Sequence, residues 1–181
     1  MAAPMRLDKR VRAQVDRTQA EEKTQFLAFN LGGEAFAMEI RSIKEVIQYG
    51  ELTQVPLMPE FIRGVINLRG AVVPVIDLSV RFGRPPTEVA RRTCIVILEV
   101  PWQGGEVELG VVVDHVSEVL DIAVSEIEPA PAFGSALRSE FIAGVGKVGG
   151  RFVILLDVAH VLSIDEMAAL AAGSAGEEAA T

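Results

Sequence analysis

Two aspartates stand at matching places in a near-repeat of this sequence, and paired carboxylates can serve as general acid and general base. Asp77 ends the apolar run AVVPVID, and Asp157 ends the run RFVILLD. A catalytic pair would need perturbed pKa values in one shared cleft. Each aspartate also comes directly before a predicted helical turn, where Asp is a favoured N-cap. We therefore predict two helix caps and keep an acid–base enzyme as the competing hypothesis.

The other residues with reactive side chains stand alone. The segment GVGKVGG, residues 144–150, matches GxGxxG, but an apolar strand follows it where a dinucleotide site needs a helix. His115 and His160 have no neighbouring metal ligands in the sequence. Cys94 starts an apolar run, so we expect a core thiol, and a single cysteine excludes an internal disulfide. These residues predict no cofactor, no metal site and no catalytic residue.

The charge and hydropathy of the chain restrict its partners. The formal net charge is −8, whereas a nucleic-acid partner requires a basic surface. No apolar stretch reaches the ~18 residues of a membrane span, and residues 1–17 carry charges where a secretion signal needs its apolar segment. We expect a cytoplasmic protein without membrane insertion. Residues 1–24 are predicted to be a charged, solvated extension, and residues 171–181 a flexible tail.

Short apolar runs punctuated by Gly and Pro begin at residue 25, and this pattern is typical of an all-β domain. Glycine-containing pairs separate several of these runs and predict hairpins at Gly32-Gly33 and Arg69-Gly70, and a third hairpin around a loop that contains Gly104-Gly105. The predicted strands cover residues 25–31, 34–40, 43–49, 61–68, 71–77, 93–100, 106–114, 116–122, 139–148 and 151–157.

Two further signals concern Pro74 and the end of the chain. Pro74 lies inside an apolar run, so we place that strand at a sheet edge or next to a bulge. A short helix is expected after Asp157. A second is expected in SIDEMAALAA, where Ser163 can cap the helix together with Glu166, three residues on.

The chain repeats itself. Residues 61–82 align without a gap on residues 141–162 and share seven identities, and residues 36–47 align on residues 109–120. The repeat predicts two copies of one β-module of about five strands, with cores at 36–82 and 109–162. One such module has too small a core to be stable alone. We therefore expect two barrels packed about a pseudo-twofold axis, with a groove between them where a partner binds.

Arg69 interrupts the repeat at a predicted hairpin tip, because the equivalent residue is Gly149. Glycine adopts a positive φ without penalty, whereas arginine is strained in a type I′ turn unless a type I turn with a bulge replaces it. An arginine at such a tip is either an ordinary solvated side chain or a recognition residue. Its nearest plausible acidic partner is Glu45 on a preceding strand.

The stretches FIRGVINLRGAVVPVIDL, FAMEIRSIKEVI and LGVVVDHVSEVLDI, with PAPAF downstream, resemble the CheW family of chemotaxis coupling proteins. The resemblance runs from about residue 25 to residue 170, and NLRGxxxPxxDL is its most specific signature. It implies one CheW-like domain of two intertwined, five-stranded SH3-like barrels without enzymatic activity. It also implies a scaffold that bridges the tips of membrane chemoreceptors to the regulatory domain of the histidine kinase CheA in signalling arrays.

The resemblance implies roles for single positions. Arg69 and Glu45 match the arginine and glutamate that govern coupling to kinase and receptor. The positions that match the lining of the receptor-binding groove are Ile43, Gly64, Cys94 and Gly110. Cys94 departs from the family, which has a larger aliphatic residue there. The alternative is a CheW-like scaffold of a related, non-chemotaxis two-component pathway, although this sequence contains no kinase or receiver motif.

Overall fold

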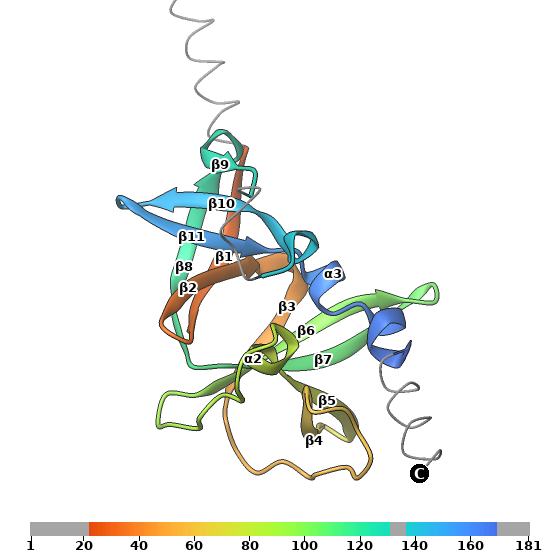
Figure 1. Ribbon diagram of the computed structural model, residues 1–181. Coiled ribbons are helices and arrows are strands. Elements are labelled where there is room, and N and C mark those ends of the chain that lie inside the picture. Colours follow the sequence, from red (N-terminus) through yellow and green to blue (C-terminus); the bar gives the residue numbers. More distant parts are fainter. Residues whose placement is uncertain (1–21, 131–136, 170–181) are drawn as a thin grey trace, which may run out of the picture.

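The computed structural model describes residues 22–130 and 137–169 (Figure 1). Most of the predicted N-terminal extension, the tail from residue 170, and residues 131–136, which include part of PAPAF, lie outside these residues. The described strands are β1 (Lys23–Leu31), β2 (Glu34–Glu39), β3 (Ile43–Gln48), β4 (Ile62–Leu68), β5 (Ala71–Asp77), β6 (Cys94–Trp102), β7 (Gly105–Val113), β8 (His115–Ala123), β9 (Ile127–Glu128), β10 (Ile142–Val148) and β11 (Arg151–Leu156).

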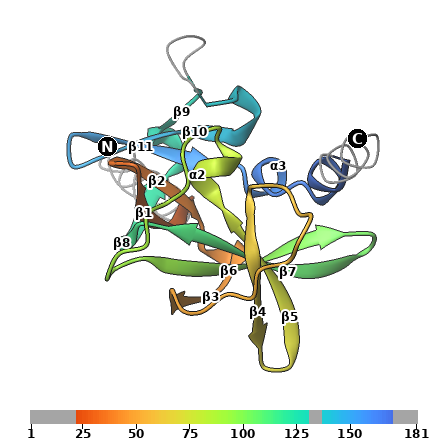
Figure 2. The same ribbon diagram turned by 60° about the horizontal axis from the view of Figure 1, so that its bottom comes forward.

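The strands form two sheets, as the all-β prediction requires. One has the order β8-β1-β2-β11-β10-β9, and the other has the order β3-β6-β7-β5-β4. Each sheet is the wall of one SH3-like barrel, and Figures 1 and 2 show the two barrels side by side. The prediction of two SH3-like barrels is confirmed.

The two copies of the repeat exchange strands between the barrels. The hairpin β1–β2 belongs to the first copy but pairs with β8 and β11 of the second copy. The hairpin β6–β7 belongs to the second copy but pairs with β3 and β5 of the first copy. Neither copy therefore forms a barrel alone, because each barrel needs a hairpin from the other half of the chain.

The backbone irregularities also recur with the spacing of the repeat. The β4–β5 pair is bulged between Ile62 and Gly64, and the β10–β11 pair is bulged between Ile142 and Gly144. The last strand of each copy then makes a parallel pair, β5 with β7 and β11 with β2. Bulges shift the register of a strand and bend it. Their repetition shows that the similarity of sequence extends to the geometry of the backbone.

Three apolar clusters fill the molecule. The smaller two lie inside the barrels, around Ile122 and Leu155 in one and Val75 and Ile97 in the other. The largest draws on both sheets and includes a row of phenylalanine rings, Phe29, Phe36, Phe82 and Phe141, with successive centroids 6.0, 5.7 and 5.9 Å apart. The junction between the barrels is thus a packed core.

The helices are short and lie where strands end. They comprise α2 (Leu78–Arg81), α3 (Val158–Val161), residues 164–169 and the 3-10 turns η1 (Ile40–Ser42), η2 (Val124–Glu126) and η3 (Ser139–Phe141). The expected helices after Asp157 and at Ser163 are confirmed, and the amide of Glu166 lies 3.4 Å from Ser163 Oγ. Pro74 lies in an inner strand, β5, but on a part of it that is unpaired on one side. It lies near the β4–β5 bulge, and the pairing of β5 with β7 begins only at Val75.

Candidate docking site

Arg69 occupies the first turn position of the β4–β5 hairpin, which Figure 2 shows projecting from its sheet. Arg69 has φ 53° and Gly70 has φ 86°, so the strained type I′ geometry is the one adopted. The amide of Gly70 donates to Asn67 Oδ1 at 2.9 Å, which helps to hold the turn. Because the Arg69 side chain is 71% exposed, burial does not compensate for this strain.

Glu45 on β3 is the acidic partner of Arg69, as predicted. Arg69 Nη2 lies 3.1 Å from Glu45 Oε2. The strands that carry them stand at opposite ends of the five-stranded order, so the sheet curls until its edges approach each other. Glu45 Oε1 is buried and accepts no hydrogen bond within the described part of the chain. An exposed ion pair contributes at most about 1 kcal/mol, so the stability of the fold gives little reason for this pair.

The four groove positions implied by the resemblance all lie in the same five-stranded sheet but not on one face. Gly110 points into the barrel, where an added Cβ would lie 2.8 Å from Ile95 Cγ2. An added Cβ on Gly64 would lie 2.6 Å from the carbonyl oxygen of Thr53. Both glycines allow close packing and offer no side chain of their own.

Ile43 and Cys94 are half-buried and pack against the large central cluster. They lie at opposite ends of the β3–β6 pair, because Ile43 is opposite Leu98 and Cys94 is opposite Gln48. The Cys94 thiol is 3.2 Å from the carbonyl oxygen of Arg92. Among the implied site residues in the described chain, the only direct side-chain contact that the structure shows is the one between Arg69 and Glu45.

The exposed apolar side chains form a pattern that the sequence prediction missed. Val46 on β3 and Val119 on β8 are both exposed, and they are equivalent in the repeat. Val72 on β5 is 70% exposed, and its equivalent on β11, Phe152, is 63% exposed. Each pair places one residue on each barrel. Applying the spacing of the repeat to the outward positions of each strand would have found both pairs.

Comparisons with known proteins agree with this architecture. Residues 25–166 match the family described as CheW-like domain. The chain belongs to the CheW family. It is 39% identical over 144 residues to the chemotaxis protein CheW of Klebsiella aerogenes, a match that covers 80% of this chain and 84% of that relative. It is 33% identical over 145 residues to the chemotaxis protein CheW of Bacillus subtilis, covering 79% of this chain and 90% of that relative.

A solved member of the CheW family has the same fold. The scaffolding protein TtCheW from Thermoanaerobacter tengcongensis superposes with a TM-score of 0.69 at 32% identity, covering 77% of this chain and 87% of that protein. The CheW-like domain therefore belongs to a family of scaffold and adaptor proteins that act in chemotaxis.

The two aspartates that could have formed an acid–base pair in this CheW-like domain are helix caps, as predicted. Asp77 is fully buried and accepts the amide of Ser79 at 3.1 Å, the amide of Thr87 at 3.0 Å and Arg63 Nη1 at 2.9 Å. Asp157 caps α3 and contacts Nδ1 of His160 at 2.8 Å. Both carboxylates are thus committed to local structure, and the competing enzyme hypothesis loses its candidate residues.

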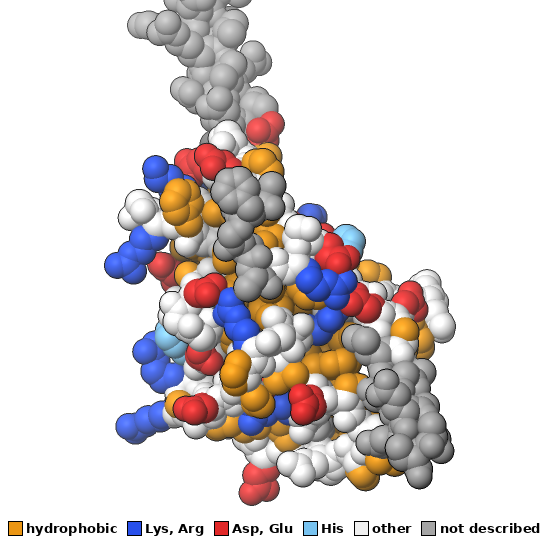
Figure 3. Space-filling view, viewed as in Figure 1, with side chains coloured by type: hydrophobic (Ala, Val, Ile, Leu, Met, Phe, Trp, Pro, Cys, Tyr) orange, Lys and Arg blue, Asp and Glu red, His pale blue; other side chains and the backbone are white. Residues whose placement is uncertain are grey.

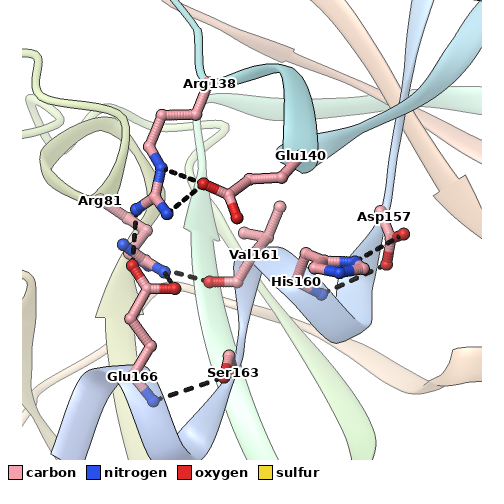
Figure 4. A network of polar contacts seen from close by, with 8 residues as sticks. All are labelled: Arg81, Arg138, Glu140, Asp157, His160, Val161, Ser163 and Glu166. Atoms are coloured by element: carbon pink, nitrogen blue, oxygen red, sulfur yellow. Dashed lines mark hydrogen bonds and ion pairs between the residues drawn. The ribbon is translucent and has the colours of Figure 1, made fainter. Parts of the chain in front are cut away.

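Two arginines, Arg81, which is buried, and Arg138, which is exposed, tie the C-terminal helix (residues 164–169) to both barrels (Figure 4). Arg81 of α2 donates from Nε to the carbonyl oxygen of Val161 at 2.9 Å and lies 3.3 Å from Glu166. Arg138 Nη1 lies 2.5 Å from Glu166, and both guanidinium groups stack over the ring of Phe141. The hydrogen bond from Arg138 lowers the pKa of Glu166 below its usual value. This network was not predicted from the sequence.

Across the part of the chain that the structure describes, no three His, Cys, Asp or Glu side chains gather into a group that could hold a metal ion. Within the same ranges, no helix has the length and apolar character needed to cross a membrane.

Proposed function

We propose that this protein is a cytoplasmic adaptor that couples membrane chemoreceptors to the regulatory domain of CheA in receptor arrays. It would act by protein–protein binding and without catalysis. Relatives named chemotaxis protein CheW support the pathway, and the scaffolding role stated for TtCheW supports the mode of action.

The observation that carries this proposal is the duplication of exposed apolar side chains. Val46 and Val72 lie on one barrel, and their equivalents Val119 and Phe152 lie on the other. An adaptor needs separate surfaces for separate partners, and a duplicated scaffold supplies two related surfaces on one rigid body. Small interfaces of this kind, below about 1,200 Å², are typical of exchangeable contacts, and repetition in an array restores avidity.

We assign control of coupling to Arg69 and Glu45. A positive φ at an exposed arginine is costly locally, and such strain is often retained for function. The planar guanidinium suits recognition of a partner's carboxylate or backbone oxygens. The proposed receptor groove also depends on Ile43, Gly64, Cys94 and Gly110. The two glycines would act there by setting the strand geometry, since they have no side chain to contribute.

The test is Arg69→Ala in an array reconstituted from receptors, kinase and this protein. We expect loss of receptor control over kinase activity, with an unchanged circular dichroism spectrum. Arg151→Ala is the matched control, because Arg151 is an exposed arginine beside the equivalent turn of the β10–β11 hairpin. Full kinase control by the Arg69→Ala protein would contradict the assigned role.

Binding of each partner is measured separately. Purified kinase regulatory domain and receptor fragments would each be titrated onto the wild-type chain and onto Val46→Glu, Val119→Glu and Phe152→Glu variants. If two distinct surfaces bridge two partners, at least one variant weakens binding to one partner and spares the other. Failure of the wild-type chain to bind either partner would contradict the proposed function as a whole.

A further inference from the structure

An apolar groove opens where the parallel pair β5–β7 comes apart. The two strands pair only from Val75 to Asp77 on β5, opposite Gly110 to Val112 on β7. Their earlier halves diverge, and Figure 2 shows the β4–β5 and β6–β7 hairpins pointing in different directions. The cavity between them has a volume of about 560 Å³ and is lined by residues 71–74 of β5, residues 106–109 of β7 and the C-terminal helix.

The groove presents apolar side chains to solvent. Val72 is 70% exposed, and Met58 and Trp102 at the rim are also exposed. In Figure 3, apolar side chains gather over β7 beside the C-terminal helix. Ile164 and Met167 of that helix close one side of the groove. An exposed apolar area of this kind marks an interaction surface.

The two faces of β7 differ in charge at the groove. Successive side chains of a strand point to opposite faces, so Val107 and Leu109 lie on one face while Glu106 and Glu108 lie on the other. These two glutamates are the only charged residues among those that line the groove in the described chain. Glu99 on β6 and Glu108 both contact Lys44, so these two carboxylates share one cation. The hydrogen bond and repulsion from Glu99 raise the pKa of Glu106.

Both walls of the groove are strand edges. Residues 71–74 of β5 pair with β4 on their other side, and residues 106–109 of β7 pair with β6. Toward the groove, neither segment has a strand partner within the described residues. Unpaired strand edges accept an added strand from another chain, with backbone hydrogen bonds giving affinity and side-chain alternation giving specificity.

A segment of this chain outside the described residues has the matching pattern. RVRAQVD, residues 10–16, alternates apolar Val11, Ala13 and Val15 with polar residues that include Arg10 and Arg12. As an added strand it would place the apolar residues on the face of Val107 and the arginines on the face of Glu106 and Glu108. The tail after residue 169 fits less well, because its charged residues are glutamates, Glu177 and Glu178.

The position of β1 favours a segment that comes from a second copy of the protein. β1 begins at Lys23, opposite Ala123 in the six-stranded sheet, whereas the groove belongs to the five-stranded sheet. Figures 1 and 2 place the start of β1 and the C-terminal helix on opposite sides of the molecule. We propose that residues 10–16 of one molecule dock as an added strand in the β5–β7 groove of another, linking copies head to tail.

Trp102 is the only tryptophan of the chain and lines this groove, so it reports docking directly. The experiment titrates a synthetic peptide of residues 8–18 into dilute full-length protein and follows tryptophan emission. We expect a saturable change, and about tenfold weaker binding for a peptide with Arg10→Glu and Arg12→Glu. A peptide in which Val11 and Arg12 are exchanged keeps the composition but breaks the alternation, and it should also bind weakly.

Full-length variants test whether copies are linked. Sedimentation velocity over a range of concentrations should show self-association of the wild-type chain. Val72→Glu should weaken self-association and peptide binding about tenfold, whereas Phe152→Glu, the equivalent change on the other barrel, should leave both unchanged. Because both residues are exposed, each variant should keep the fold, which circular dichroism checks.

Several results would overturn the proposal. One is an emission of Trp102 that does not respond to the peptide, and another is equal binding of the native and charge-reversed peptides. A third concerns the full-length chain with Arg10→Glu and Arg12→Glu. If the wild-type chain stays monomeric and these substitutions still change the emission of Trp102, the segment docks in the groove of its own molecule. If Val72→Glu abolishes binding of kinase or receptor but spares self-association, the groove belongs to that partner instead.

Discussion

The two hairpin-and-helix units of this CheW-like domain, β4–β5–α2 and β10–β11–α3, have the same backbone conformation but different side chains at two positions. Both have a bulge at the same place, a turn with two positive φ values and an aspartate cap. They differ at the turn, where Arg69 corresponds to Gly149, and at the cap, where Asp77 is buried and Asp157 is 34% exposed. The two units thus have the same backbone geometry, while the side chains at the turn and the cap differ in type and in burial.

The cap aspartates should show the largest difference between the two units. Asp77→Ala removes the cap, leaves Arg63 without its carboxylate and deprives Thr87 of an acceptor, so we expect a loss of about 3–5 kcal/mol in the free energy of unfolding. Asp157→Ala removes an accessible cap and should cost about 1 kcal/mol. Urea denaturation of both variants measures the difference, and similar losses would contradict it.

Alanine substitutions of the glycines at the two bulges should differ less in their effect on the free energy of unfolding. An added Cβ on Gly64 meets the carbonyl oxygen of Thr53, a backbone atom that accepts a hydrogen bond from the amide of Val65, while the Thr53 amide donates to the carbonyl oxygen of Val65. An added Cβ on Gly144 meets first Cγ2 of Ile127, a side-chain atom, also at 2.6 Å. We expect Gly64→Ala to cost about 2–3 kcal/mol and Gly144→Ala about 1–2 kcal/mol.

Thermal unfolding of the two alanine variants ranks them. Gly33→Ala serves as a reference for strain without crowding, because Gly33 has φ 84° and no atom lies within 4 Å of its added Cβ. A larger loss of stability for Gly144→Ala than for Gly64→Ala would contradict this ranking. It would show that the backbone at Thr53 moves more easily than the side chain of Ile127.

The turn residues should respond in opposite directions when they are exchanged. Arg69→Gly relieves a positive φ at a residue with a Cβ, a gain of about 1 kcal/mol, but loses an exposed ion pair of similar or smaller value. Its free energy of unfolding should stay within about 1 kcal/mol of wild type or rise. Gly149→Arg introduces the same strain, and an exposed ion pair with Glu118, the equivalent of Glu45, would offset it only in part, so this variant should lower the free energy of unfolding by up to about 1 kcal/mol.

The Arg69→Gly substitution also separates an effect on stability from an effect on receptor–kinase coupling. Under the proposed function, Arg69→Gly loses receptor control of the kinase although the protein is no less stable. A marked loss of stability in Arg69→Gly would mean that the turn needs arginine for folding. It would contradict the proposal that the strained arginine is retained for function.

Local features of both units were predictable from the sequence. The glycine-containing turns, the aspartate caps and the Arg69–Glu45 pair follow from residue types over short distances, and the structure contains all of them. The two-residue strand β9 was missed, because two residues are too few to show a periodicity. The repeat itself was visible because whole segments align without a gap.

Long-range choices were not predictable from local pattern. The alternation of apolar and polar residues in each hairpin is equally compatible with pairing inside its own copy. Only the family resemblance predicted that β1–β2 and β6–β7 are exchanged between the barrels. Burial of Arg81 depends on packing against residues about 80 positions away, which no local signal reveals. The same limit applies to the groove between β5 and β7, which exists only because strands from different copies meet.

The smallest expected effect concerns Glu166, which has no counterpart in the first unit, where Pro86 occupies the equivalent position. Because Arg138 holds the pKa of Glu166 below its usual value of 4.5, the folded state favours the ionised carboxylate. This contribution to stability is complete above pH 4.5 and is lost as the pH falls through the lowered pKa. Glu166→Gln should therefore weaken the decline in stability below pH 4.5. Urea denaturation midpoints at pH 7 and at the lowest pH at which the protein is folded measure this decline in stability. Glu140→Gln is the control, because it leaves the contact between Arg81 and Glu166 in place. An acid decline as steep in Glu166→Gln as in wild type would show that the C-terminal helix is held by its apolar contacts alone.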